Sequence, residues 1–266
     1  MKIAIIGAGN MGGATARGLA QGTRVAPGDI CVSNPSQGKL EALKADFPAM
    51  RVTNDNRECV RGADLVILAV KPWKMEEVIT EIRDELDYGQ VSVASMAGGL
   101  GTEAVSRMLD RGDGAVLPPV FYLIPNTAIA VRQSMTFISG VRASREMEQW
   151  MVQAFGELGD AMWVEERLMG AGMALASCGI AYAMRYVRAA TEGGVELGMY
   201  ARDAQRIVAQ TLKGAVALLQ ANQSHPEQEI DKVTTPGGIT IRGLNAMEQA
   251  GFTNSVVQGL KASKTT

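Results

Sequence analysis

Hydrophobic and polar positions follow two different periods along this chain of 266 residues. In the first half, short runs of β-branched and aliphatic residues alternate with stretches in which apolar residues recur every three or four positions. The strand-like runs cover residues 2–6, 30–33, 65–70, 91–95, 116–124 and 136–139, and the helix-like stretches include residues 11–21, 37–46 and 74–86. Such alternation is typical of a doubly wound parallel sheet in an α/β fold.

The pattern changes near residue 164, where β-branched alternation stops and the helical period continues to the end. Helices are predicted over residues 165–197, 201–223, 239–250 and 254–262. We therefore predict two domains, an α/β domain over residues 1–163 and an all-α domain over residues 164–266.

A glycine-rich turn follows the first strand-like run directly. Gly7, Gly9 and Gly12 have the spacing G-x-G-x-x-G and stand at the head of a helix. In this context the first glycine permits a tight turn, the second lets the backbone approach a pyrophosphate, and the third lets helix and strand pack closely. The strand, turn and helix together favour a dinucleotide site in a Rossmann-type fold over a purely structural turn.

The end of the second strand indicates which dinucleotide binds. An NAD site usually has a carboxylate there for the ribose 2′-hydroxyl, but this chain has Ser33, Asn34 and Ser36, with Lys39 one turn later. These groups would accept a 2′-phosphate, so NADPH is the expected cofactor. No arginine accompanies them, and use of NADH stays open. Two more strand ends, residues 69–73 and 95–99, are expected to contact the nicotinamide and its ribose, because they lie at the same rim of the sheet. An ordinary strand exit would explain the same residues, and Pro72 alone would explain the first.

Composition and charge limit the kinds of partner that this protein is expected to bind. The net charge of −2 and the pI near 5.6 give no electrostatic reason to expect nucleic acid or an anionic membrane. The longest uncharged run, residues 168–184, only reaches the lower limit for a membrane span, and its many small residues favour a close helix–helix interface instead. The apolar run at the N-terminus is too short for a signal peptide, so no export signal is expected. The odd number and wide spacing of the cysteines predict a reducing, cytoplasmic setting.

The cysteines and the histidine exclude several kinds of chemistry. Cys31, Cys59 and Cys178 are widely spaced and predict neither a disulfide framework nor a metal site. The single histidine, His225, precedes a proline, a position more typical of a turn entering a helix than of a catalytic base. No metal is expected.

A second glycine motif lies late in the chain, in the segment VTTPGGITIRGL that begins at Val233. Gly237 and Gly238 are predicted at the N-terminus of a helix, with free backbone N–H groups that could bind a carboxylate. Thr235 and Thr240 would add hydroxyl groups. A helix cap with a flexible loop explains the same residues equally well.

Five segments of the chain, GAGNMG, LAVKPW, SMAGG, IPNTA and DKVTTPGGITIRGL, resemble pyrroline-5-carboxylate reductase, the family that catalyses the last step of proline synthesis. The resemblance follows nearly the whole chain in order, and the late glycine motif is its most specific part. It implies an N-terminal NAD(P)H domain and a C-terminal helical domain that forms a homodimer, with the active site between one subunit's cofactor and the other's helices. Dimers of this family often assemble into larger rings.

The resemblance also implies roles for particular residues. Substrate contacts would fall on Thr235, Gly237, Gly238 and Thr240. Cofactor contacts would fall on Gly7, Ala8, Gly9, Asn10, Met11, Gly12, Ser33, Asn34, Ser36, Asn56, Ala69, Val70, Lys71, Pro72, Ser95, Met96 and Ala97. A protonated cyclic imine accepts hydride without a protein base, so the chemistry needs no histidine. We predict reduction of 1-pyrroline-5-carboxylate to L-proline, with Thr240 as the catalytic residue that contacts the ring nitrogen.

Two segments depart from the family pattern. The usual G-S-G-P-A-Y is replaced by residues 177–182, which lack the proline and one glycine, and the usual R-x-M-P-N-T-P by residues 122–128, which begin with Tyr122 and lack the arginine and the last proline. These departures keep two alternatives open. One is a related NADPH-dependent imine or ketone reductase with another substrate, and the other is a non-catalytic NADPH-binding dimer.

Overall fold

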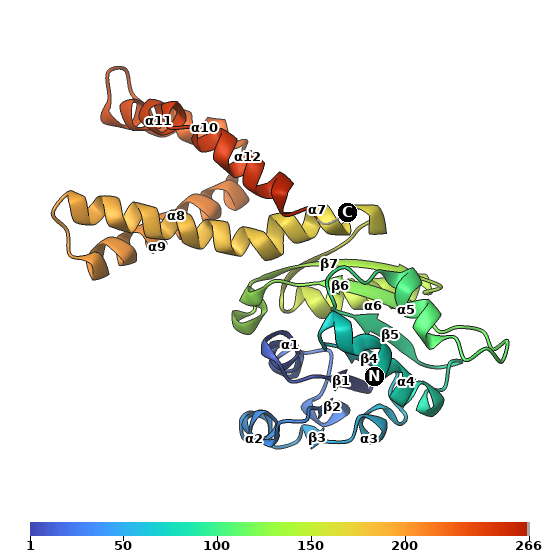
Figure 1. The fold of residues 1–266 in the computed structure, drawn as a ribbon. Coiled ribbons are helices and arrows are strands. Elements are labelled where there is room, and N and C mark those ends of the chain that lie inside the picture. Colours follow the sequence, from blue (N-terminus) through green and yellow to red (C-terminus); the bar gives the residue numbers. More distant parts are fainter. Residues whose placement is uncertain (265–266) are drawn as a thin grey trace. The chain divides into compact units, whose positions relative to one another are not determined.

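The computed structural model describes residues 1–264, which form two compact units over residues 1–177 and 178–263 (Figure 1). The first unit is built on an eight-stranded sheet with the order β3-β2-β1-β4-β5-β6-β7-β8. Strands β1 to β6 are parallel, β7 is antiparallel to β6, and β8 is parallel to β7. The strands are β1 (Ile3–Ile6), β2 (Ile30–Ser33), β3 (Arg51–Thr53), β4 (Leu65–Leu68), β5 (Ser92–Ser95), β6 (Val120–Ile124), β7 (Ser134–Val141) and β8 (Gly159–Trp163).

Helices cover both faces of this sheet. Along β1, Ile3 and Ile5 join one apolar cluster, whereas Ala4 and Ile6 join another, because successive side chains of a strand point to opposite faces. The first cluster includes residues of α1 (Asn10–Gln21), α2 (Gln37–Asp46) and α6 (Arg145–Gly156), and the second includes residues of α3 (Asn56–Val60), α4 (Met75–Ile82) and α5 (Thr102–Leu109). The predicted doubly wound α/β fold is therefore confirmed.

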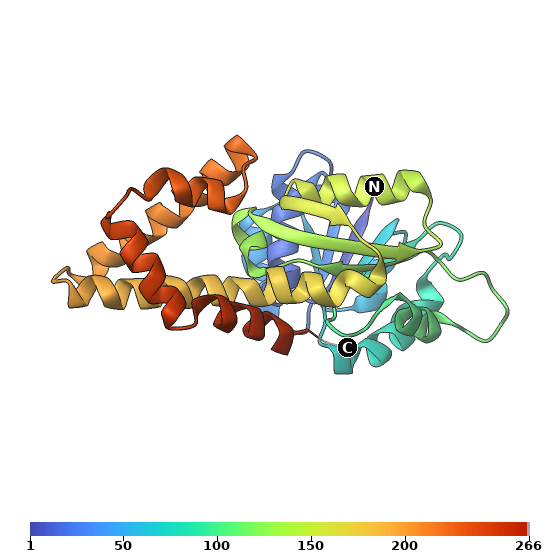
Figure 2. The same ribbon diagram turned by 90° about the horizontal axis from the view of Figure 1, so that it is seen from above.

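The second unit contains only helices. They are α8 (Gly179–Glu196), α9 (Ala201–Asn222), α10 (Pro226–Val233), α11 (Ile239–Gln249) and α12 (Phe252–Ala262). Helices α8 and α9 pack along each other, as Figures 1 and 2 show. Ala204 is the only buried residue between residues 178 and 263. This unit therefore has no apolar core of its own in a single chain.

A short irregular segment comes before α8. It consists of a 3-10 turn at Glu166–Leu168, the α-helix α7 (Met169–Gly172) and a π-helical stretch at Met173–Cys178. The sequence predicts one continuous helix here, and the π-helix breaks its regular hydrogen bonding. No helix within residues 1–264 combines the length and apolarity needed to cross a bilayer.

Other differences from the predicted elements have local causes. The strand predicted from residue 116 begins only at Val120, because Pro118 and Pro119 have no N–H group to offer a sheet. The hydrophobic pattern predicts neither β3 nor β8. Both are edge strands, and both leave side chains partly exposed, so they lack a continuous apolar run.

Candidate functional site

A cavity of about 680 Å³ lies at the carboxyl ends of the strands in the first unit. Thirteen of the predicted cofactor residues line it, namely Gly7, Gly9, Asn10, Met11, Ser33, Asn34, Asn56, Ala69, Val70, Lys71, Pro72, Met96 and Ala97. Ala8, Gly12, Ser36 and Ser95 do not. Lys74, Glu77 and Glu81 also line the cavity, and no motif in the sequence indicates them. The structure thus brings together segments that are spread over about 90 residues of sequence.

The three glycines of the first motif meet different surroundings. Gly7 has φ +102°, and a Cβ atom there would lie 2.6 Å from the carbonyl oxygen of Ala69. A Cβ on Gly12 would lie 1.9 Å from the carbonyl oxygen of Gly7, so this glycine lets the helix pack closely. A Cβ on Gly9 would meet no atom within 4 Å. Gly9 therefore leaves open space at the cavity, which is what the approach of a pyrophosphate requires.

Backbone N–H groups in this turn divide into two sets. The N–H of Gly7 donates to the carbonyl oxygen of Ser33 at 2.8 Å, and the N–H of Ala8 donates to Oδ1 of Asn34 at 3.0 Å. Helix α1 then begins at Asn10 without a side-chain cap. The N–H groups of its first turn have no partner within the helix and carry the positive end of its dipole. The N–H groups of this first turn are available to an anionic ligand, whereas the N–H groups of Gly7 and Ala8 stabilise the turn itself.

A chain of hydrogen-bonded polar side chains lines the cavity beside β2. Ser33 is fully buried and donates from Oγ to Oδ1 of Asn56 at 2.7 Å, while Nδ2 of Asn56 donates to Oε2 of Glu81 at 2.8 Å. No sequence motif indicates Glu81, because it lies on α4 in an ordinary helical pattern. Ser36 and Lys39 are exposed at the start of α2. Lys39 lines both this cavity and a neighbouring one of about 520 Å³, which also includes Ala8 and Arg17.

On the other side of β1, the turn after β5 is fixed by hydrogen bonds. Met96 donates from N–H to the carbonyl oxygen of Leu68 at 3.0 Å, and the buried Ser95 accepts at Oγ from the N–H of Ala97 at 3.2 Å. Gly99 donates from N–H to the hydroxyl oxygen of Tyr122 at 3.0 Å. Burial raises the pKa of Tyr122, so its hydroxyl is protonated at neutral pH.

The late glycine motif forms a tight turn in the second unit. The N–H of Gly238 donates to the carbonyl oxygen of Thr235 at 2.9 Å, and Gly237 has φ +70°, the conformation that a type II turn with Pro236 in its second position requires. The expectation that Gly238 offers a free N–H group is therefore wrong, because the turn uses that donor. Helix α11 begins at Ile239 without a side-chain cap, and Thr240 is exposed in its first turn.

His225 begins helix α10 as its N-cap residue. Its Nδ1 accepts from the N–H of Glu227, and its own N–H donates to the side chain of Gln228 at 3.1 Å. The interpretation of His225 as a residue of the turn entering a helix is confirmed.

The strand order and the glycine turn define a Rossmann-type fold followed by a helical region, and comparisons with known proteins specify it further. Residues 2–98 match the family model described as NADP oxidoreductase coenzyme F420-dependent, and residues 166–266 match that described as pyrroline-5-carboxylate reductase dimerisation. Pyrroline-5-carboxylate reductase 2 of Dictyostelium discoideum is 33% identical over 98% of this chain and 90% of its own length. For reductase 1 of that organism the identity is 34%, and the chain spans 48% of its length.

A solved structure agrees with these relatives. The pyrroline-5-carboxylate reductase of Coxiella burnetii superimposes with a TM-score of 0.89 at 28% identity, covering 98% of this chain and 95% of its own. This chain belongs to the pyrroline-5-carboxylate reductase family. The assignment of individual residues to cofactor and substrate stays a prediction.

Proposed function

We propose that this protein reduces 1-pyrroline-5-carboxylate to L-proline with NADPH. The observation that carries the proposal is the cavity at the carboxyl ends of the parallel strands, where Gly9 leaves open space beside the uncapped start of α1. This cavity lies in a chain that belongs to the pyrroline-5-carboxylate reductase family. When bound, NADPH supplies a hydride to the imine carbon. With that hydride and the proton it already carries, the imine would become a secondary amine, with NADP⁺ as the oxidised product.

The cofactor contacts follow from the polar groups around this cavity. The first turn of α1 would hold the pyrophosphate through its N–H groups. Ser36 and Lys39, exposed at the start of α2, would hold the 2′-phosphate of the adenosine ribose. The hydrogen bonds that join Ser33, Asn56 and Glu81 would fix the cavity wall beside that phosphate. NADH would lack the phosphate contacts and bind less tightly.

The substrate contacts are assigned to the late glycine turn. Thr235, Gly237, Gly238 and Thr240 would form the substrate site, in which the first-turn N–H groups of α11 and the threonine hydroxyls would bind the substrate carboxylate and ring nitrogen. The N–H of Gly238 is engaged in the turn, so its role is to shape the loop. Thr240 would hydrogen bond the ring nitrogen as its charge is lost.

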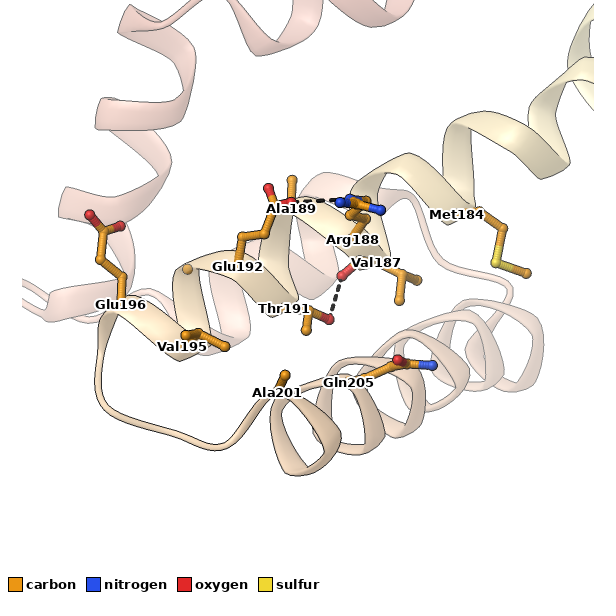
Figure 3. Close-up of a pocket in the computed structure, with 11 residues that line it drawn as sticks. Met184, Val187, Arg188, Ala189, Thr191, Glu192, Val195, Glu196, Ala201 and Gln205 are labelled. Atoms are coloured by element: carbon orange, nitrogen blue, oxygen red, sulfur yellow. Dashed lines mark hydrogen bonds and ion pairs between the residues drawn. The ribbon is translucent and has the colours of Figure 1, made fainter.

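The second unit supports a homodimer. Apolar side chains on α8 and α9, among them Val195, Ile207 and Leu218, are about half exposed, at 46%, 49% and 54%. A cavity of about 980 Å³ opens between the two helices, beside the ion pair of Arg188 and Glu192 (Figure 3). Apolar surface of this extent calls for a partner, and we assign it to the helices of a second copy.

We extend the proposal to a larger assembly and to a location in the cell. The dimers would associate into a ring, as dimers of this family often do. A cytoplasmic location agrees with the three free cysteines, Cys31, Cys59 and Cys178, because a reducing compartment keeps thiols unpaired.

The test compares wild-type protein with Thr240→Ala and Thr240→Ser, measuring NADPH oxidation and proline formation from 1-pyrroline-5-carboxylate. Loss of a hydrogen bond to a charged group is expected to lower kcat/KM of the alanine variant about ten- to a hundredfold, while the serine variant keeps most of its activity. NADPH binding should be the same in all three. Wild-type protein that binds NADPH but forms no proline would refute the substrate assignment.

A second candidate is a related imine or ketone reductase with another substrate. The altered segments favour it, since residues 122–128 and 177–182 differ from the family pattern in sequence. The same assay with a panel of cyclic imines and ketones separates the two, because a higher kcat/KM on another compound would select the second.

A further inference from the structure

The loop between β5 and α5, residues 96–101, borders the cofactor cavity. Three of its residues, Met96, Ala97 and Gly98, line the cavity directly. In the proposed binding mode, the start of α1 binds the pyrophosphate and the end of β2 binds the adenosine ribose. Strands β4 and β5 lie on the opposite side of β1 from β2, so this loop faces the nicotinamide half of the cofactor.

Tyr122 fixes the middle of this loop. It lies on β6, its side chain is 5% exposed, and its hydroxyl oxygen accepts from the N–H of Gly99 at 3.0 Å. Gly99 has φ +82°, a conformation that glycine adopts without strain. In a trans peptide the N–H and the preceding carbonyl point in opposite directions. The contact with Tyr122 therefore also sets the direction of the carbonyl of Gly98, a cavity residue.

Glu166 fixes the end of the loop. Its Oε1 accepts from the N–H of Thr102 at 2.8 Å, and its Oε2 accepts from the hydroxyl of the same residue. Thr102 is the first residue of α5, where N–H groups lack helical partners, so the carboxylate caps the helix from a distant part of the chain. A Cβ atom on Gly101 would lie 2.1 Å from Oε1 of Glu166, which shows how closely the loop approaches this carboxylate.

We propose that Tyr122 and Glu166 are positioning residues, which hold residues 96–101 in place against the nicotinamide half of bound NADPH. This inference rests on the proposed function for the identity of the cofactor. Tyr122 stands where the family pattern has an arginine, so its hydroxyl is a feature of this chain. Neither side chain lines the cavity, and both act through the loop.

The experiment measures binding of two ligands to the full-length protein by calorimetry. One ligand is NADPH, and the other is 2′-phospho-ADP-ribose, which lacks the nicotinamide. The variants are Tyr122→Phe, which removes only the hydroxyl, and Glu166→Ala, with Glu166→Gln as the conservative change. The matched control is Tyr88→Phe, which removes a hydroxyl that donates to the carbonyl oxygen of Leu109 outside the cavity.

We expect the variants to lose affinity for NADPH but not for the fragment. Tyr122→Phe and Glu166→Ala should raise the Kd of NADPH about tenfold and leave the Kd of the fragment nearly unchanged, because only the nicotinamide half loses its support. Glu166→Gln keeps one acceptor oxygen and should recover most of the affinity. Tyr88→Phe should change neither Kd.

Two results would overturn the inference. Equal weakening of both ligands would mean that the side chains merely stabilise the unit, and unchanged NADPH binding would mean that the loop needs neither of them. The proposed reaction fails separately, if wild-type protein binds NADPH without forming proline, and the binding comparison then still decides the role of the loop. Wild-type protein that does not bind NADPH would refute both proposals.

Discussion

Replacing Gly9 and Gly12 by alanine, one at a time, tests the account of the glycine turn most directly. Both glycines belong to one motif, but the added methyl group would meet different surroundings. On Gly12 it would lie 1.9 Å from the carbonyl oxygen of Gly7 and 2.7 Å from Cβ of Ala69, whereas on Gly9 it would meet no protein atom within 4 Å. The Gly12 change should therefore affect stability and binding together, and the Gly9 change should affect mainly binding.

The magnitudes follow from these distances. Relief of the Gly12 contact requires a shift of about 1 Å between α1 and the turn, and such overpacking costs about 1–3 kcal/mol. We take about 3 kcal/mol, since the nearest atom is backbone. The better helix propensity of alanine returns about 1 kcal/mol, which leaves a loss of about 2 kcal/mol and a fall in Tm of about 4–8 °C. Gly9 is the N-cap of α1, and alanine there should cost only about 0.5–1 kcal/mol.

The assay combines thermal unfolding with NADPH titration for the two variants and the wild type. Gly9→Ala should unfold within about 3 °C of the wild type and bind NADPH at least about tenfold more weakly, because its methyl group occupies the path of the pyrophosphate. Gly12→Ala should lose both stability and affinity. Wild-type affinity in Gly9→Ala would refute the position given to the pyrophosphate, and wild-type Tm in Gly12→Ala would refute the packing argument.

Three further predictions concern charge and association. Lys39→Glu should lower the preference for NADPH over NADH about tenfold or more, as measured by the ratio of the two kcat/KM values, because a carboxylate repels the 2′-phosphate. Hydrogen bonds from Lys232, Ser224 and Asn222 lower the pKa of Glu229 from 4.5 to about 2, so its stabilising effect should be complete above pH 4.5 and disappear as the pH falls towards 2. Chemical unfolding of wild type and Glu229→Gln across this range should converge at low pH, and a constant difference would contradict the argument. Val195→Glu, on the exposed face of α8, should give a monomer by light scattering that still binds NADPH but forms little proline; a persistent dimer would place the interface elsewhere.

Several parts of the fold are readable from the sequence because their signals are local. The run at residues 30–33 coincides with β2, and the apolar period over residues 37–46 coincides with α2. The spacing of Gly7, Gly9 and Gly12 after a buried strand identifies the turn, since consecutive residues define both its conformation and its helix. Edge strands β3 and β8 carry no such signal, because only their partners in the sheet make them strands.

The sequence likewise predicts only part of the candidate site. Sequence motifs indicate the segments around the cavity, but Glu81 and Glu166 come from an ordinary helix and a 3-10 turn without a motif. Tyr122 belongs to a family segment, but nothing in that segment predicts its contact with Gly99. The engagement of the Gly238 N–H was likewise invisible, because a hydrogen bond to Thr235 depends on how the turn closes.

The sequence by itself determined the alternation of the central strands and helices, the glycine turn and the family, because these depend on the periods and spacings of neighbouring residues. Only the tertiary structure decided which side chains support the cavity walls and which N–H groups remain available to a ligand. Asn56 and Glu81, or Thr102 and Glu166, lie 25 and 64 residues apart, and their hydrogen bonds exist only because packing of the helices on the sheet brings those residues together.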